Sequence, residues 1–247
     1  MQILITRDTS NVEPFESYLR QCGFAPFSVP LIETCAIAVP DGVLLQMLRA
    51  PSDGELVWVF SSPQGALFLA EALSGTVVPE AIHFVAQGEA TAHSLLGHFG
   101  ERSESTVSPV RTSREMGEWL DRIFPDMQTR FVIVGPKDRS RGCEEVLRSA
   151  DRSVGVVPVY ETRGRRVTAE ERQLVEQFYA KGTVVFFSPS AVQSWGDNGF
   201  ESPFRIASFG PVTSEAIVKN GMTVAFEAPS NSLEEFARTL RNFRDRV

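Results

Sequence analysis

Hydroxyl-bearing side chains follow two buried strands of the sequence and could take part in binding. Ser62 comes two residues after the apolar run 57–60, Ser188 comes directly after the run 183–187, and a proline follows each serine. A serine N-cap with a proline in the first helical position is a strong signal for a helix start. The amide groups of a helix N-terminus also attract anions. Both serines are therefore predicted to cap helices, and anion binding is an open second role.

A second pair of turns has a glycine followed three residues later by a threonine. These are Gly88 with Thr91, and Gly210 with Thr213. A glycine lets the backbone turn tightly, and a threonine hydroxyl can bond a first-turn amide or a ligand carboxylate. Neither turn has the glycine fingerprint of a dinucleotide-binding fold or of a P-loop, so nucleotide binding is not supported.

Basic residues gather where two strands are expected to end. Arg7 ends the first strand, and Lys137, Arg139 and Arg141 follow the run 131–134. They are either solvated loop charges or partners for the carboxylates of a substrate. The chain has a net charge of −7, so it lacks the overall basic surface of a nucleic-acid-binding protein. Any anion site must then be built locally.

Tyr160 is a candidate acid. It lies in "VPVYET" at 157–162, whereas the related stretch "VPLIET" at 29–34 has Ile32 in that place. The phenol either packs at a sheet edge with its hydroxyl satisfied, or donates a proton or hydrogen bond to a leaving hydroxyl. A phenol with a pKa of about 10 is a weak acid at neutral pH. The sequence has no GxSxG motif, no paired Cys and His, and no clear pair of catalytic carboxylates.

The metal-binding and membrane signals are weak. Three cysteines and three histidines are scattered along the chain, which predicts neither a disulfide framework nor a metal site. No apolar run is long enough to span a bilayer, and the first residues read as a buried strand rather than a signal peptide. We therefore expect a reduced, cytoplasmic protein.

An internal repeat sets the expected fold. Short runs rich in Val, Ile and Phe alternate with amphipathic stretches, which indicates parallel sheets covered by helices on both faces. The two serines at the strand ends lie 126 residues apart, the two glycines 122 apart, and Ser113 and Ser232 119 apart. The chain is therefore predicted to be an α/β protein with two flavodoxin-like parallel-sheet domains.

Two domain arrangements fit this repeat. In a tandem arrangement the domains are 1–125 and 126–247. Alternatively, the "VPxxET" strands cross between domains, so that 1–35 plus 165–247 form a discontinuous domain and 36–160 form an inserted one. The linker strands would then be about 29–36 and 157–164. The sequence pattern alone leaves both arrangements open.

Six stretches, in this order and spacing, carry a resemblance that covers nearly the whole chain. They are "LITR" at 4–7, "GFAPFSVPLIE" at 23–33, "VFSSPQGA" at 59–66, "VAQGEATAHSLLGHFG" at 85–100, "VVFFSPSAVQSW" at 184–195 and "SFGPVTSEAIVKNG" at 208–221. Together with "VPVYET" they resemble the uroporphyrinogen-III synthase family. Ser61 stands where that family commonly has threonine, and Phe187 stands at the matching place of the second copy.

The resemblance implies the crossing arrangement, with two flavodoxin-like domains joined by a two-stranded β linker and a cleft between them. It implies an enzyme that cyclises hydroxymethylbilane, a linear tetrapyrrole with eight carboxylates, with loss of water and inversion of ring D. No cofactor or metal is implied, and we expect a monomer that binds neither nucleic acid nor membrane. Tyr160 is the implied catalytic residue. The binding positions that the resemblance implies are Ser62, Thr91, Ser188 and Thr213. We also expect Arg7, Gly88, Arg139, Ser190 and Ser214 to bind the substrate.

Two other functions remain as alternatives to this expectation. A non-enzymatic small-molecule binder or sensor with the same fold would not need Tyr160. A dinucleotide-dependent enzyme is disfavoured, because the glycine fingerprint is missing.

Overall fold

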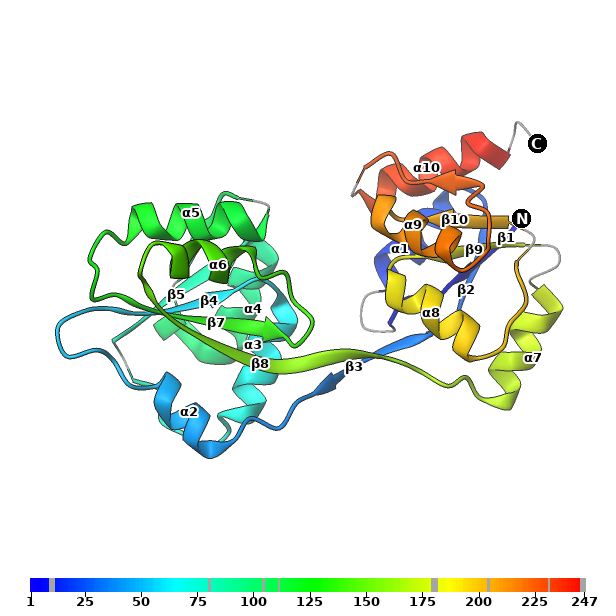
Figure 1. Cartoon of the computed structure of the whole chain (residues 1–247). Helices are drawn as coiled ribbons and strands as arrows, with labels where there is room; N and C mark the ends of the chain where they lie inside the picture. Colours follow the sequence, from blue (N-terminus) through cyan, green and yellow to red (C-terminus); the bar gives the residue numbers. More distant parts are fainter. Residues whose placement is uncertain are drawn as a thin grey trace. The chain divides into compact units, whose positions relative to one another are not determined.

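The computed structural model of the chain describes residues 1–8, 12–79, 81–103, 105–110, 112–178, 182–203, 205–230 and 232–244. The chain divides into two compact units. Unit 1 consists of Met1–Thr34 and Thr162–Val247, and unit 2 consists of Cys35–Glu161. Each unit has its own sheet with helices on both faces (Figure 1).

Unit 1 contains a five-stranded sheet in which neighbouring strands are parallel. Its order is β2-β1-β9-β10-β11. The strands are β1 (Gln2–Ile5), β2 (Ala25–Ser28), β9 (Thr183–Phe186), β10 (Arg205–Ser208) and β11 (Phe226–Glu227). The helices are α1 (Glu13–Gln21), α7 (Ala169–Phe178), α8 (Pro189–Asp197), α9 (Pro211–Lys219) and α10 (Leu233–Arg244).

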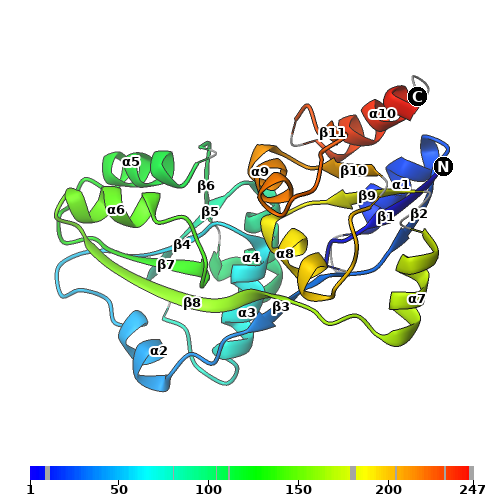
Figure 2. The same ribbon diagram turned by 45° about the vertical axis from the view of Figure 1, so that its right-hand side comes forward.

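The helices of unit 1 bury alternate residues of its strands on opposite faces of the sheet. Ile3 and Ile5 pack in a cluster with residues of α1 and α10, whereas Leu4 packs in a cluster with residues of α7, α8 and α9. Figure 2 shows α1 and α10 together on one side of this sheet. A strand with both faces covered reads as a continuous apolar run, which is why "ILI" is apolar without alternation.

Unit 2 contains a six-stranded sheet of order β3-β8-β7-β4-β5-β6. The strands are β3 (Ile32–Ala36), β4 (Leu56–Phe60), β5 (Ile82–Gln87), β6 (Thr106–Ser108), β7 (Arg130–Pro136) and β8 (Ser153–Gly164). The helices are α2 (Asp41–Met47), α3 (Pro63–Ala72), α4 (Glu89–Phe99), α5 (Ser113–Ile123) and α6 (Gly142–Ser149), with a 3-10 turn at Gly100–Ser103. α5 and α6 cover the face of Val57 and Val59, while α2, α3 and α4 cover the face of Trp58 and Phe60 (Figure 1).

Apart from the additional strand β3, the two sheets have the same strand order when the repeats are matched. β1, β2, β9, β10 and β11 of unit 1 correspond to β7, β8, β4, β5 and β6 of unit 2. Both units then follow the order second, first, third, fourth, fifth, which is the flavodoxin order. The predicted α/β class with two flavodoxin-like parallel sheets is confirmed.

The two "VPxxET" strands lie side by side and run in opposite directions. The Ile37 amide donates to the Val159 carbonyl at 2.9 Å, and the Arg165 amide donates to the Leu31 carbonyl at 2.8 Å. Each copy packs in a different core, because Leu31 belongs to a cluster of unit 1 and Val159 to a cluster of unit 2. β3 and β8 therefore both contain a point where the chain passes from one unit to the other.

One predicted repeat match differs by a residue. Ser113 was matched with Ser232, but the helix caps are Thr112 and Ser232, which accept hydrogen bonds from Glu115 and Glu235 at 3.2 Å each. Ser113 instead lies in the first turn of α5, and its Oγ accepts the Cys143 amide at 3.0 Å. The two corresponding caps, Thr112 and Ser232, are therefore 120 residues apart. Among the described residues no helix is long and apolar enough to cross a membrane.

Arg152 closes the C-terminal end of α5 in unit 2. Its side chain is only 3% exposed, and its Nε donates to the Asp121 carboxylate at 2.6 Å. Its other nitrogens donate to the carbonyls of Asp121, Phe124 and Asp126 at 3.0, 2.8 and 2.6 Å. The last carbonyls of a helix lack intrahelical partners, so this guanidinium satisfies groups that α5 cannot satisfy itself.

We predict that Arg152→Met lowers the free energy of unfolding by about 3 kcal/mol, because buried carbonyls and a carboxylate lose their donor. Urea denaturation would measure the loss. Arg148→Met is the matched control, since the Arg148 side chain is 55% exposed and pairs with Glu144 at the surface of α6. That change should lower stability by only about 0.5 kcal/mol. Similar losses in the two variants would contradict this role of Arg152.

Candidate functional site

The predicted site residues follow the carboxyl ends of parallel strands. In a sheet of flavodoxin order, ligands bind where the first and third strands are neighbours and the connections diverge. These neighbours are β1 and β9 in unit 1, and β7 and β4 in unit 2. Arg7 follows β1 and Ser188 follows β9, while Arg139 follows β7 and Ser62 follows β4. The structure thus brings these four residues to the switch points of their sheets.

Ser62 and Tyr160 are two predicted residues that the fold brings into hydrogen-bond contact. Ser62 is the N-cap of α3, and its Oγ accepts the Gly65 amide at 3.2 Å. The same oxygen lies 2.9 Å from the Tyr160 hydroxyl. The two residues are 98 positions apart, so only the tertiary fold joins them.

A bulge in β8 aims Tyr160 at the helix. Gly135 pairs with Pro158, but the next residue, Pro136, pairs with Tyr160, so β8 has one extra residue here. Strict alternation would send Val159 and Tyr160 to opposite faces. Both belong instead to the cluster beneath α3, where the Tyr160 ring lies 5.5 Å from that of Phe68. Bulges commonly redirect a side chain in this way.

Burial raises the pKa of Tyr160, and the hydrogen bond with Ser62 acts in the opposite direction. Tyr160 is 8% exposed. The phenol is therefore protonated at neutral pH, so it can supply a proton but cannot act as a base. When Ser62 donates its own proton to the phenol oxygen, the phenol proton is left for another acceptor.

Ser188 repeats the same cap with a different partner. It is the N-cap of α8, its Oγ accepts the Ala191 amide at 3.3 Å, and its second bond is to the Ser190 Oγ at 2.9 Å. The residue in the place of the tyrosine is Ile32, which lies in the core of unit 1. The two copies thus share the cap and differ in what its hydroxyl contacts.

The glycine–threonine turns expose main chain rather than hydroxyls. Gly88 is the N-cap of α4 with φ +83, a conformation that favours glycine. Thr91 is 1% exposed, and its Oγ1 donates to the Gln87 carbonyl at 3.1 Å. Thr213 is also buried, and it lies in the first turn of α9, the helix whose N-cap is Gly210. What these turns present is thus the first amides of α4 and α9, and hydroxyl contacts from the threonines stay a prediction.

Ser214 belongs to an internal polar network of unit 1. Its Oγ lies 2.6 Å from the Ser208 Oγ and donates to the Glu227 carboxylate. A carboxylate of the protein itself is therefore bound in the first turn of α9. Its binding role, like that of Ser190, stays a prediction.

Arg7 lies over an aromatic ring. Its guanidinium is 5.3 Å from the centre of the Phe187 ring, a cation–π distance. Burial lowers the pKa of Arg7, and Asp8 acts in the opposite direction, but an arginine remains charged in either case. Phe187 is the departure from the expected family pattern, and the structure gives it a packing role that a hydroxyl could not fill.

Arg139 has a carboxylate partner in the first turn of α6. Its Nη2 lies 2.5 Å from Glu144, and Arg148 bonds the same carboxylate at 3.1 Å. Burial acts to raise the pKa of Glu144, but the hydrogen bonds from the two arginines outweigh it and hold that pKa below its usual range. Lys137 pairs with Glu161 at 3.1 Å. The Glu144 partner lies five positions along the chain and could have been found from spacing.

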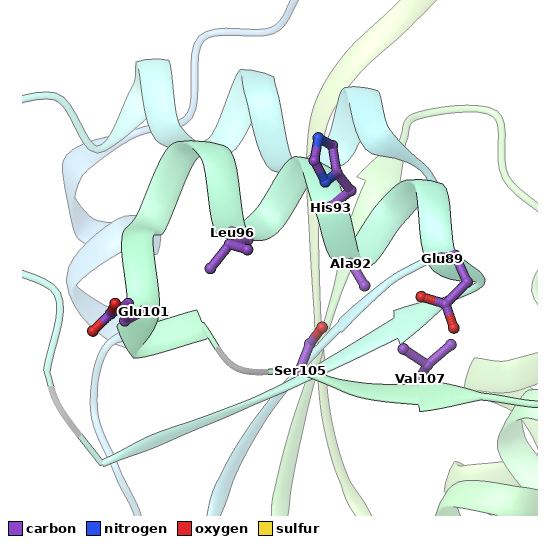
Figure 3. A pocket seen from close by; sticks show the side chains of 7 residues that line it. All are labelled: Glu89, Ala92, His93, Leu96, Glu101, Ser105 and Val107. Atoms are coloured by element: carbon purple, nitrogen blue, oxygen red, sulfur yellow. The ribbon is translucent and has the colours of Figure 1, made fainter.

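A groove of about 690 Å³ between α4 and β6 does not suit an anionic ligand (Figure 3). Glu89 and Glu101 line it together with His93 and the apolar side chains of Ala92, Leu96 and Val107. None of the predicted site residues lines it. Among the described residues no group of three His, Cys, Asp or Glu could hold a metal ion.

We predict that Ser62→Ala raises the pKa of Tyr160 further, because the bond with Ser62 is what opposes the effect of burial. Tyrosine labelled with 13C at the ζ carbon would report the titration by NMR, with Tyr160→Phe identifying the resonance. Ser188→Ala is the matched control, since it removes an equivalent cap with a loss of about 1 kcal/mol in stability but contacts no tyrosine. Equal Tyr160 titration in the wild type and both serine variants would contradict the prediction.

Comparisons with known proteins identify the family and the fold of the chain. A family model described as "Uroporphyrinogen-III synthase HemD" matches residues 13–237. The uroporphyrinogen-III synthetase structure from Helicobacter pylori is 17% identical with a TM-score of 0.68, over 98% of this chain and 99% of that one. A mutant uroporphyrinogen III synthase from the extremely thermophilic bacterium Thermus thermophilus is 15% identical with a TM-score of 0.57, over 100% of both chains. These structures share the fold.

No curated protein sequence matches the chain. The family match nevertheless spans most of the sequence and both units. The chain belongs to the uroporphyrinogen-III synthase family.

Proposed function

We propose that the chain is a uroporphyrinogen-III synthase. It closes the linear tetrapyrrole hydroxymethylbilane to uroporphyrinogen III, with loss of the terminal hydroxyl as water and inversion of ring D. The family match over residues 13–237 carries this proposal. The reaction is a cofactor-independent lyase reaction of a monomeric cytoplasmic protein.

Tyr160 is the residue that we propose assists the departure of the hydroxyl. A leaving hydroxyl becomes water when a proton reaches its oxygen as the C–O bond breaks. The protonated phenol supplies a donor, and the Ser62 hydroxyl can hold the phenol oxygen from the other side at 2.9 Å. Because burial makes the phenol a weaker acid, its contribution is a strong hydrogen bond rather than early proton transfer.

The remaining site residues are proposed to receive carboxylates. Helix N-termini hold anions through their amides and dipoles, so an acidic chain can still bind a substrate with eight carboxylates. In unit 2 these groups are the first turns of α3 and α4 with Ser62, Gly88, Thr91 and Arg139. In unit 1 they are the first turns of α8 and α9 with Arg7, Ser188, Ser190, Thr213 and Ser214.

The main task of such an enzyme is to control conformation. Hydroxymethylbilane closes unaided to the uninverted isomer, so the protein must favour one closure over a competing one. Holding the reacting ends in the productive geometry is the largest available contribution. The repeated caps supply fixed anchor points for the substrate's carboxylates, which is the contribution that this reaction requires.

The first test is the reaction itself. Purified protein incubated with hydroxymethylbilane should give the type III isomer faster than the spontaneous closure. Isomers separated by chromatography after oxidation measure the ratio. Formation of the type I isomer alone, at the spontaneous rate, would favour the non-enzymatic binder or sensor and reject the synthase.

We predict that Tyr160→Phe lowers kcat by about 10–100-fold, at the low end of general acid catalysis, because the phenol is a weak acid. The ring remains to pack against Phe68, so the loss of stability should be about 1 kcal/mol, that of one hydrogen bond. Tyr18→Phe in α1 is the control. Unchanged turnover in Tyr160→Phe, with circular dichroism intact, would leave Tyr160 a packing role only.

A further inference from the structure

At four corresponding positions of the two units, unit 1 has a phenylalanine and unit 2 has a residue that is not aromatic. Ser61 and Phe187 follow the matched strands β4 and β9. Gln87 and Phe209 follow Ala86 and Ser208, which are the register partners of Phe60 and Phe186. Met116 and Phe236 each come four residues after their helix caps. Cys143 and Phe15 are both buried, and each lies six residues before the last residue of its helix, α6 or α1. Each pair thus occupies one place in the repeated fold.

In unit 1 these four places are filled by rings that pack on one another. Phe15 lies 5.2 Å from Phe187 and 5.4 Å from Phe236. Phe209 lies 5.1 Å from Phe187 and 5.6 Å from Phe236. Aromatic side chains therefore fill the region at the carboxyl ends of β1, β9 and β10 on this face of the sheet.

In unit 2 the same four places line a cavity of about 300 Å³, which we call the unit 2 cavity. All four counterparts take part, namely Ser61, Gln87, Met116 and Cys143. Its other lining residues are Val59, Ser113, Ile133, Pro136, Asp138, Arg139 and Ser140. Smaller or polar side chains in place of four phenylalanines account for the space. It is large enough for about ten water molecules at ~30 Å³ each, hence for one short polar chain and not for a whole tetrapyrrole.

Arg139 gives the unit 2 cavity its chemistry. Its Nε is buried without a hydrogen-bond partner, while its Nη2 is held by Glu144. Arg139 lines the cavity and its side chain is 18% exposed, so the part of the guanidinium that Glu144 does not hold can face a carboxylate there. Asp138 also lines the cavity and opposes a free anion, so the affinity for an untethered carboxylate should be low.

The unit 2 cavity adjoins the residues that the proposed function uses. Ser61 precedes Ser62, and Pro136 is the register partner of Tyr160. Both Ser61 and Pro136 line the cavity. The cavity lies on the face of the sheet covered by α5 and α6, whereas Tyr160 lies on the face covered by α3. A substrate with its leaving hydroxyl at Tyr160 would therefore reach the cavity over the carboxyl ends of β4 and β7, where Ser61 and Pro136 lie.

We infer that the unit 2 cavity is a subsite for one carboxylate-bearing side chain of the substrate, with Arg139 as its hydrogen-bond donor. This inference rests on the proposed function. Binding of one arm raises the effective concentration of the rest of the substrate, so a weak local affinity is sufficient. The corresponding region of unit 1 is filled by phenylalanines, so only unit 2 has this subsite. The two units of the duplicated fold would therefore bind different parts of the substrate.

The first experiment tests the cavity without catalysis. Protein labelled with 13C at the methionine methyl groups is titrated with propionate, and with propionamide as its uncharged equivalent. Propionate should shift the Met116 resonance in a saturable manner and leave Met222 of unit 1 unmoved, while propionamide should have no saturable effect. Ser61→Phe, which copies unit 1, should abolish the shift, and Gln87→Phe is a second filling variant should the first fail to fold.

The second experiment measures steady-state kinetics with hydroxymethylbilane. Ser61→Phe should raise KM at least tenfold with kcat changed less than threefold, while Leu174→Phe on the exposed face of α7 should change neither. An unshifted Met116, an equal response to propionamide, or an unchanged KM would overturn the inference. A wild-type protein that makes no type III isomer would instead reject the proposed function, and the propionate titration would still decide whether the cavity takes a carboxylate.

Discussion

The pairing of β8 with β7, with its bulge at Pro136, is the constraint on which the site of unit 2 depends. It places the Tyr160 backbone carbonyl 2.8 Å from the Lys137 amide and turns the ring toward α3. The N-cap of α3 can then use its second hydrogen bond on a phenol from a strand 98 residues away. If β8 alternated regularly through Val159 and Tyr160, the tyrosine would point to the opposite face, toward α5 and α6.

Duplication explains the framework, and a few departures from it explain the difference between the units. Both units keep the flavodoxin strand order, the serine caps and the glycine turns. The cap hydroxyl meets Tyr160 in unit 2 and Ser190 in unit 1. In unit 1, Phe187 of the phenylalanine cluster contacts the Arg7 guanidinium, whereas the corresponding region of unit 2 contains the unit 2 cavity. A symmetric scaffold thereby acquires the asymmetry that an asymmetric substrate needs.

Sequence reasoning succeeded where the physics is local. The Ser-Pro caps, the glycine turn with positive φ and the continuous apolar strands follow from one or two turns of chain. It did not find the Ser62–Tyr160 bond, whose partners come from distant elements. It also missed two local details, the bond of the Thr91 hydroxyl to the Gln87 carbonyl and the helix cap at Thr112. The unit 2 cavity exists only as a difference between two folded copies, and no single stretch of sequence contains it.

The chemistry that we propose sets limits on how strong an acid Tyr160 needs to be. Burial beneath α3 excludes water from the phenol and raises its pKa, which weakens it as an acid but strengthens any hydrogen bond it makes in that environment. A substrate that already loses its hydroxyl spontaneously gains little from a stronger acid, and an acid that acted before the chain was fully placed would promote the uninverted closure. A weak, well-positioned donor couples departure to binding, because it acts only when the anchored carboxylates have brought the hydroxyl to it.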